Sequence, residues 1–176
     1  MTERKEGLTE YYQAIHSTIK DLIPELPDGS IKLFDETVED LSFSGPTILV
    51  EFCEAKLPQK SSSNKHIELK VKLHCVLSSA NDDLPLACAN MAAYVMTIAE
   101  RNAWGLEAVS HPTNLSALPG RYGVGENGFD SWIVEFDQTL KIADSWSPVN
   151  FVPNEVLWGI APEVGLGHED KYKPAE

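Results

Sequence analysis

The chain of 176 residues lacks the features that mark several common protein classes. It has three cysteines, Cys53, Cys75 and Cys88, and no C-x-x-C spacing of the kind found in redox and zinc sites. No apolar run reaches the roughly 18 residues of a membrane span. The first residues, MTERKEGLTE, are charged and contain no signal-peptide core. We therefore expect a protein of the reducing cytoplasm with no membrane partner, whose cysteines are small buried apolar residues.

Basic residues are also scarce. The 14 Lys and Arg residues stand against 27 Asp and Glu residues, which gives a net charge of −13 at pH 7. Such a surface repels nucleic acid and anionic lipid, so neither is an expected direct partner. Solubility is the simplest explanation of the charge. The apolar fraction of 43% is ordinary for a globular protein with one core.

A glycine-rich stretch raises the possibility of nucleotide binding. Gly123, Gly125 and Gly128 match the pattern G-x-G-x-x-G. A dinucleotide-binding loop lies between a strand and a helix, because the pyrophosphate binds at the helix N-terminus. The residues after Gly128 alternate with period two and predict a strand instead. We interpret these glycines, together with Gly120, as positive-φ positions of a turn, and we expect no cofactor.

No other residue pattern predicts catalysis or metal binding. The sequence has no G-x-S-x-G elbow and no H-x-x-x-H pair. His66 and His74 are expected on the solvent-facing side of a strand. His168, Glu169 and Asp170 could contact a metal, but they stand in a terminal segment without a supporting scaffold. The sequence therefore predicts a protein that is not an enzyme and holds no metal.

Hydrophobic periodicity predicts two helices and several strands. The helices are expected over 8–22 and 83–104, and the strands over 46–52, 65–79, 106–120 and 129–142. Asp82 or Asp83 is expected to cap the second helix. The polar segment 56–64 is expected to be the loop of a long hairpin.

The same periodicity predicts which side chains are buried. For the second helix they are Leu84, Ala87, Cys88, Met91, Val95 and Ile98. For the strand over 65–79 they are Ile67, Leu69, Val71, Leu73, Cys75 and Leu77, alternating with exposed Glu68, Lys70, Lys72 and His74. For the last strand they are Trp132, Val134, Phe136, Leu140 and Ile142.

These elements predict an α+β fold. We expect an antiparallel or mixed β-sheet of about four or five strands, with two helices packed on one face and a long β-hairpin. Residues 1–142 form the predicted domain. From Ala143 the sequence becomes rich in proline, with short apolar patches around Trp146 and Trp158. We therefore predict an extended C-terminal arm over 143–176 that packs along another surface.

The arm carries a resemblance to a known family. The stretch VLWGIAPEVGLGHEDKY, residues 156–172, resembles the C-terminal signature of the Mu-like phage tail terminator family. The order of predicted elements is also similar, so the resemblance extends over roughly Leu8 to Tyr172. It implies a structural protein of the virion neck in a contractile-tailed phage, without catalytic residues, made in the host bacterial cytoplasm.

The resemblance further implies a set of partners. Six copies would form a ring that caps the tail tube and sheath, stops their polymerisation, and offers a surface to the head connector. DNA would pass through the ring without specific binding. The arm would contact a neighbouring subunit or the sheath through Val156, Leu157, Trp158, Gly159, Ile160, Ala161 and Pro162. The hairpin loop offers a second contact through Leu57, Pro58, Gln59 and Lys60.

Three other functions remain open from the residues alone. A head-completion or head–tail joining protein of the neck would use the same small domain in a ring. A small-molecule or nucleotide-binding enzyme would rest on the glycine stretch. A monomeric binding module would join no particle.

Overall fold

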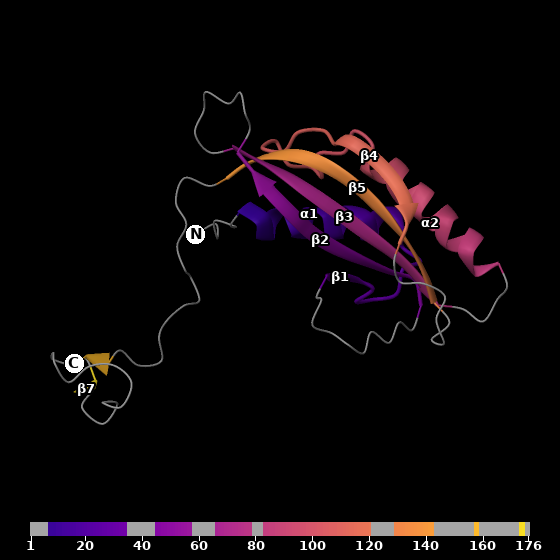
Figure 1. Ribbon diagram of the computed structural model, residues 1–176, viewed down its shortest axis with the longest axis horizontal. Helices are drawn as coiled ribbons and strands as arrows, with labels where there is room; N and C mark the ends of the chain where they lie inside the picture. The colour runs from indigo at the N-terminus through magenta and orange to yellow at the C-terminus, as the bar shows by residue number, and fades with distance from the viewer. Residues whose placement is uncertain are drawn as a thin grey trace. The chain divides into compact units, whose positions relative to one another are not determined.

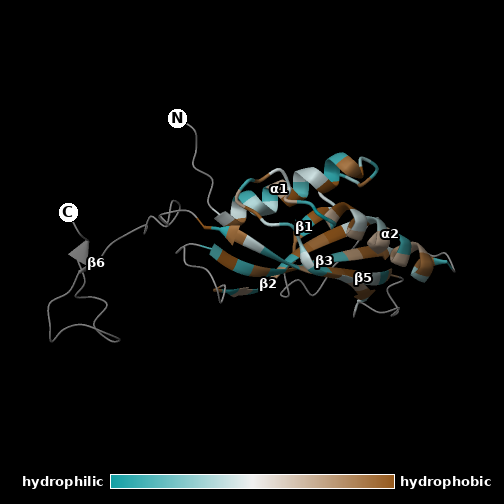
Figure 2. Ribbon diagram, turned by 90° about the horizontal axis from the view of Figure 1, so that it is seen from above, coloured by the Kyte–Doolittle hydropathy of each residue, from teal (hydrophilic) through white to brown (hydrophobic). Residues whose placement is uncertain are grey.

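The computed structural model describes residues 7–34, 45–57, 66–78, 83–120 and 129–142, and the backbone of two short strands at 157–158 and 173–174. The chain divides into two compact units, Met1–Asp144 and Ser145–Glu176. In the first unit a twisted sheet carries both helices on the same face (Figures 1 and 2). In the second unit two strands pair with each other.

The first unit contains seven of the nine helices and strands that the structure describes. Their bounds are α1 Gly7–Leu22, β1 Ile31–Leu33, β2 Thr47–Lys56, β3 His66–Ser78, α2 Leu84–Ala99, β4 Thr113–Pro119 and β5 Phe129–Lys141. The five-stranded sheet has the order β1-β2-β3-β5-β4. The β1–β2 pair is parallel and the other pairs are antiparallel. The predicted α+β fold, with a mixed sheet, a long β2–β3 hairpin and two helices on one face, is confirmed.

Helix α1 forms as its sequence pattern predicts. Tyr11, Ile15 and Ile19 recur every fourth residue and are fully buried against the sheet. The helix ends at Leu22, two residues before Pro24, which has no backbone N–H to continue it. Local sequence and tertiary packing therefore agree over the middle of this element, whereas Leu8 and Leu22, which belong to the same apolar stripe, are exposed at its ends.

Helix α2 buries most of the residues that the sequence predicts. Its buried residues are Leu84, Cys88, Ala92, Val95, Ile98 and Ala99, which confirms the prediction for Leu84, Cys88, Val95 and Ile98. Ala87 is exposed and Met91 is only half-buried, so these two predictions are wrong. Apolar residues also lie on the outer side of this helix, so periodicity predicts the buried face only in part. Packing selects the face where Ala92 and Ala99 allow close approach to the sheet.

The predicted start of α2 is only partly correct. Asp83 occupies the N-cap position and Pro85 lies in the first turn, as expected. However, the Asp83 side chain makes no capping hydrogen bond, so its predicted capping role is wrong. Asp82 lies outside the described residues.

Strand β3 is the centre of the sheet, paired along its whole length with β5. Leu69, Val71, Leu73 and Cys75 are buried beneath the helices, as the alternation predicts. Ile67 and Leu77, near the strand ends, are half-buried. On β5 the predicted core residues Val134, Phe136 and Leu140 are buried, whereas Trp132 and Ile142 are half-buried.

A polar side chain, Gln138, lies among the apolar residues of β5 and is 1% exposed. Its Oε1 accepts hydrogen bonds from the hydroxyl of Tyr11 and from Nε1 of Trp104, the latter at 2.7 Å. Its Nε2 donates to the carbonyls of Asn102 at 2.9 Å and Ser110 at 2.6 Å. All four hydrogen-bonding positions of the amide are used. Gln138 therefore joins α1, the segment after α2, and β5 at one point.

The segment after α2 depends on this network. Trp104 has a φ of 57°, which is rare for a bulky side chain and costs on the order of 1–3 kcal/mol. Its backbone N–H donates to Asn102 Oδ1 at 2.7 Å, and its ring packs against Phe136 with centroids 6.1 Å apart. These contacts, together with the bond to Gln138, hold Trp104 in its strained conformation.

The glycine-rich stretch joins β4 to β5, so the strand predicted after Gly128 is confirmed. Gly120 does not have the predicted positive φ, because among the described glycines that conformation belongs to Gly29 and Gly105. A Cβ at Gly120 would instead collide with the side chain of Ser131. Glycine is thus required here by close approach of β4 and β5. Residues 121–128 lie outside the described residues.

Replacing Gln138 with Leu should strongly destabilise the domain. The change leaves the hydroxyl of Tyr11, the indole N–H of Trp104 and two carbonyls without their buried partner, at about 1–3 kcal/mol for each unsatisfied group. We expect a loss of at least about 4 kcal/mol in the free energy of unfolding, measured by urea denaturation. The matched change Gln13→Leu, at an exposed position of α1, should leave the urea midpoint almost unchanged. Equal midpoints for Gln138→Leu and wild type would contradict the role of the network.

Candidate interaction surfaces

The sheet face opposite the helices carries rows of alternating charge. In one row Glu51 of β2, Lys72 of β3 and Glu135 of β5 are register partners. In the next row the partners are Glu54, Lys70 and Asp137. A third row pairs Lys56 with Glu68 and Glu68 with Thr139. Opposite charges in neighbouring strands attract each other, so these rows also stabilise the register of the sheet.

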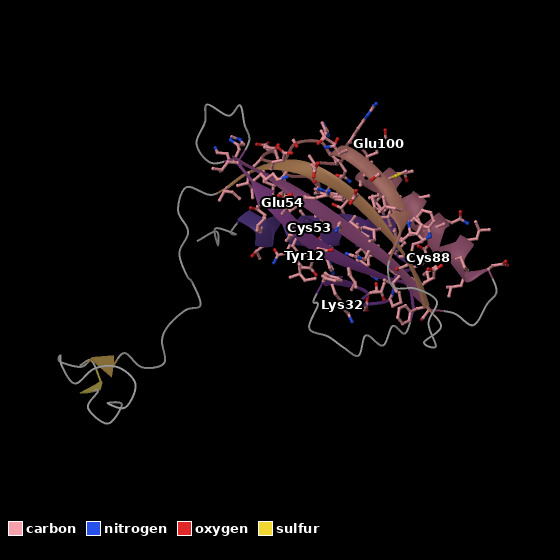
Figure 3. The ribbon with its side chains drawn as sticks, in the orientation of Figure 1. Tyr12, Lys32, Cys53, Glu54, Cys88 and Glu100 are labelled. Carbon is pink, nitrogen blue, oxygen red and sulfur yellow. The ribbon has the colours of Figure 1, made fainter. Side chains whose placement is uncertain are left out.

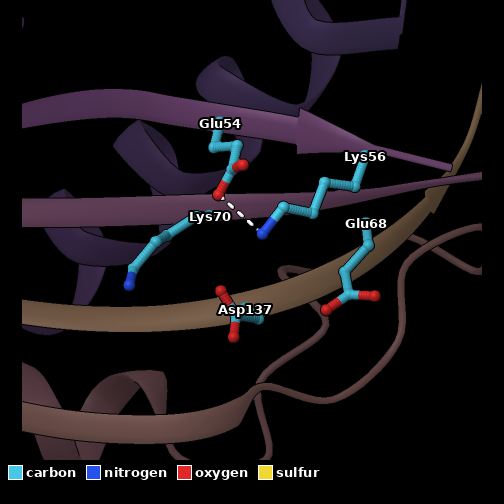
Figure 4. Close-up of a pocket in the computed structure, with 5 residues that line it drawn as sticks. All are labelled: Glu54, Lys56, Glu68, Lys70 and Asp137. Atoms are coloured by element: carbon cyan, nitrogen blue, oxygen red, sulfur yellow. Dashed lines mark ion pairs between the residues drawn. The ribbon is translucent and has the colours of Figure 1, made fainter. Parts of the chain in front are cut away.

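The charged rows surround a shallow hollow, drawn in Figure 4. Its lining residues are Glu54, Lys56, Glu68, Lys70 and Asp137. Lys56 Nζ lies 2.8 Å from Glu54 Oε2, and Lys70 Nζ lies 3.9 Å from Glu135 Oε2. The hollow has a volume of about 80 Å³. Small-molecule pockets begin at roughly 300 Å³, so this size suits contact with a protein surface better than a bound metabolite.

The other end of the same sheet face is buried. His74 is 5% exposed, and Val76 is fully buried. The ring of Phe34, which follows β1, stacks on His74 with centroids 4.8 Å apart and an interplanar angle of 12°. The prediction that His74 faces solvent is therefore wrong, while Glu68, Lys70 and Lys72 lie on the charged face as predicted. Alternation identifies the two faces of a strand but not what covers each face.

His74 is paired with Glu51 across the β2–β3 ladder. The atoms His74 Nε2 and Glu51 Oε2 are 2.6 Å apart. Burial lowers the pKa of His74, and the Glu51 carboxylate offsets this only in part. Burial would raise the pKa of Glu51, but the hydrogen bond from His74 and the charge of Lys72 outweigh it and lower that pKa. At neutral pH a neutral imidazole therefore donates its Nε2 proton to a charged carboxylate.

The cysteines differ in burial. Cys75 and Cys88 are buried, as predicted, and the thiol of Cys88 donates to the carbonyl of Cys75 at 3.3 Å. Cys53 is exposed, so its predicted burial is wrong. The register shifts between Phe52 and Glu54, which identifies Cys53 as the extra residue of a β-bulge on β2 (Figure 3). Partial burial and the Glu51 carboxylate raise the pKa of Cys53 to about 11, so its sulfur is an unreactive thiol at neutral pH.

The predicted contact residues fall mostly outside the described part of the chain. Leu57 ends the described portion of the hairpin and is 81% exposed. Pro58, Gln59 and Lys60 lie outside the described residues. Leu157 and Trp158 form β6, Leu157–Trp158, which pairs antiparallel with β7, Lys173–Pro174. The remaining arm residues, Val156, Gly159, Ile160, Ala161 and Pro162, are not described, nor are His168, Glu169 and Asp170.

Sequence reasoning missed the Glu51–His74 pair and the Gln138 amide. Both had a signal in the sequence, namely a polar residue within a strongly apolar strand, but its meaning depends on partners far along the chain. Within the described ranges no group of three His, Cys, Asp or Glu side chains is placed to hold a metal ion. No helix described here is both long and apolar enough to cross a membrane.

Comparisons with known proteins add little. No protein-family model and no curated protein matches the chain. Seven chains of solved structures match it. One of them has 10% sequence identity and a TM-score of 0.46, over 76% of this chain and 97% of the other. A likeness at that level indicates neither activity nor partners, so function is inferred from the residues of this chain.

The Glu51–His74 pair should make stability depend on pH. The folded state holds His74 with a lowered pKa, so protonation favours the unfolded chain as the pH falls below about 6.5. The contribution of Glu51 to the stability of the folded state is lost at a pH below that at which His74 titrates, because folding also lowers the pKa of this carboxyl group. We expect the urea midpoint of the wild type to fall between pH 7 and pH 5.5. In His74→Gln, which keeps a donor for Glu51 but cannot titrate, the midpoint should change much less, and a slope equal to that of the wild type would exclude His74 as its source.

Proposed function

We propose that the chain is a structural protein of a phage virion, a tail terminator that caps the tail tube and sheath as a ring. The observation that carries the proposal is the segment 156–172, which resembles the family signature, on a chain with the α+β architecture that the resemblance implies. In this role a homo-hexameric ring stops tail polymerisation and provides the interface to the head connector.

The open edges of the sheet support assembly into a ring. β4 is the last strand on one side of the sheet. On the other side β1 pairs with Ile48 to Val50 alone, so the rest of β2 has no outer neighbour among the described strands. Backbone groups along such edges can accept a strand from another protein chain. A different edge on each side of one subunit suits head-to-tail contacts, which are the contacts that close into rings.

The charged sheet face supports a role in contact rather than in chemistry. Its described carboxylates, Glu51, Glu54, Glu68, Glu135 and Asp137, outnumber the lysines Lys56, Lys70 and Lys72. A surface on which carboxylates outnumber lysines does not attract DNA. Such a surface suits either the wall of a DNA conduit or a polar contact between proteins. The raised pKa values of Cys53 and Cys88, each about 11, leave both thiols protonated and poorly nucleophilic.

The first test is the length of tails in lysates made with and without this protein. If the protein ends tail growth, electron microscopy should show overlong or ragged tails when it is missing. Restoring the protein from a plasmid should return the tails to normal length. Normal tails beside unjoined, leaking heads would contradict the proposal and would indicate a head-completion or head–tail joining protein.

The arm should be needed for assembly but not for folding. Among the described residues, Leu140 is the last one of the buried core of the first unit, and the second unit begins at Ser145. We expect a chain lacking Pro153 to Glu176 to keep the circular dichroism spectrum and urea midpoint of the full chain. The same chain should fail to restore normal tails in the complementation assay. Loss of cooperative unfolding after the deletion would show instead that the arm belongs to the core.

A further inference from the structure

The charged sheet face carries a pattern that is reversed from one row to the next. Glu54 of β2 and Lys70 of β3 are partners in one row, and Lys56 and Glu68 are partners in the following row. On each strand the carboxylate and the lysine are two residues apart, so both side chains point to the same face. A strand of this kind matches each carboxylate with a lysine when it faces its own copy running in the opposite direction.

Strand β5 continues the pattern. Asp137 and Thr139 are its members of the same two rows. Against its own antiparallel copy, β5 sets the Asp137 carboxylate opposite the Thr139 hydroxyl, which can donate a hydrogen bond. One row further out it sets Glu135 opposite Lys141, which follows Thr139 on the same side of the strand. Three neighbouring strands, β2, β3 and β5, therefore favour the same arrangement.

We propose that the charged sheet face is a two-fold contact between two copies of this chain. The axis lies between the two facing sheets, perpendicular to the strands, and passes between the row of Lys70 and the row of Glu68. Each strand then faces the same strand of the other copy in the opposite direction. Lys70 of each copy meets Glu68 of the other, and Glu54 of each copy meets Lys56 of the other. This reciprocity is what a two-fold contact requires.

The charges select this axis over its alternatives. A two-fold axis along β3 would set Lys70 against Lys70 and Glu54 against Asp137. An axis perpendicular to the strands but one row away would set Lys70 against Lys72. Both arrangements bring like charges together and are repelled. In the proposed contact one pairing, Lys72 with His66, lacks a carboxylate, and the pairings nearest the axis all attract.

The shape of the sheet suits the same axis. The strands of a sheet twist about a direction perpendicular to them, and the proposed axis has that direction. Each strand is therefore tilted in the same sense as the strand that it faces, so facing strands stay aligned across the contact. The shallow hollow lies between the two central rows, and the axis crosses it (Figure 4). The side chains of Lys56 and Glu54 beside it are 62% and 50% exposed, which lets them reach the other copy.

Net charge restricts where two copies can meet. Each copy has a net charge of −13, so strongly acidic surfaces of two copies repel each other. The described part of the charged sheet face is nearly neutral, because four lysines, Lys56, Lys70, Lys72 and Lys141, stand against its five carboxylates. In the contact Lys56 and Lys70 keep the carboxylates of their own sheet and gain one from the other copy. Neither is left buried without an opposite charge, which is the costly outcome.

The dimer does not depend on the proposed function, because a ring uses head-to-tail contacts whereas this contact is two-fold. The test is sedimentation velocity of the purified full chain over a range of concentrations. The wild type should dimerise reversibly. Glu68→Lys and Lys70→Glu should each raise the dimer dissociation constant roughly tenfold or more, because each change sets like charges together at two equivalent places. A wild type that stays monomeric would overturn the contact.

An equal mixture of the two variants separates the contact from any effect on folding. A chain with Glu68→Lys and a chain with Lys70→Glu present opposite charges to each other at both places. The mixture should therefore form a heterodimer about as tight as the wild-type dimer. Mixing changes nothing inside either chain, so it cannot repair a folding defect. Chains with wild-type circular dichroism spectra that fail to form the heterodimer would contradict the proposed axis.

A gain of affinity tests the axis on a third strand. Thr139→Lys sets a lysine against Asp137 of the other copy and should lower the dissociation constant several-fold, whereas Thr139→Glu should raise it. The new lysine lies beside Glu68 in its own sheet, so the fold should not suffer. Ser17→Lys, at an exposed position of α1, changes the net charge equally and should have a much smaller effect. Equal effects of the two lysines would show that net charge alone governs association and would overturn the contact. Tail length in lysates would still decide the proposed function separately.

Discussion

The side-chain amide of Gln138 fixes how the helices lie on the sheet. Its hydrogen bonds reach Tyr11 on α1, Trp104 and Asn102 after α2, and Ser110 before β4. A buried amide satisfied in only one arrangement of its neighbours gives that arrangement an energetic advantage over alternative packings. The segment after α2 enters the core at Trp104, so the amide also determines where α2 ends.

The two faces of the sheet contribute differently to the protein: one face supplies stability and the other carries the charged surface. Under the helices, close packing of apolar side chains supplies stability, and no described residue there offers reactive chemistry. On the other face, charged rows at one end give way at the other end to buried His74, which contacts half-buried Glu51 and Phe34. Each lysine of the rows has a carboxylate as its register partner, although the carboxylates outnumber the lysines. Charges arranged in this way contribute to the specificity of a contact more than to its strength.

Sequence pattern predicts the parts of this fold that depend on local periodicity. The alternation along β3 and the fourfold spacing of Tyr11, Ile15 and Ile19 were sufficient to identify a strand and a helix. The bulge at Cys53, the burial of His74 and the collision that requires glycine at position 120 each depend on a neighbour that is distant in sequence. The face of α2 was predicted only in part, because Leu84, Cys88, Val95 and Ile98 are buried as expected while the apolar residues Ala87 and Met91 on neighbouring positions weaken the periodic signal. The interaction surfaces could not be predicted from local sequence either, because the exposure of a side chain depends on what tertiary packing leaves uncovered.

The lack of charge on α2 is best understood against the charge of the whole chain. Excess carboxylates give the chain a net charge of −13 and oppose contacts between its charged surface and other anionic surfaces. An uncharged helix face escapes that repulsion, and it is also the face that costs most to leave in water. Both effects favour covering α2, and neither requires a partner of opposite charge.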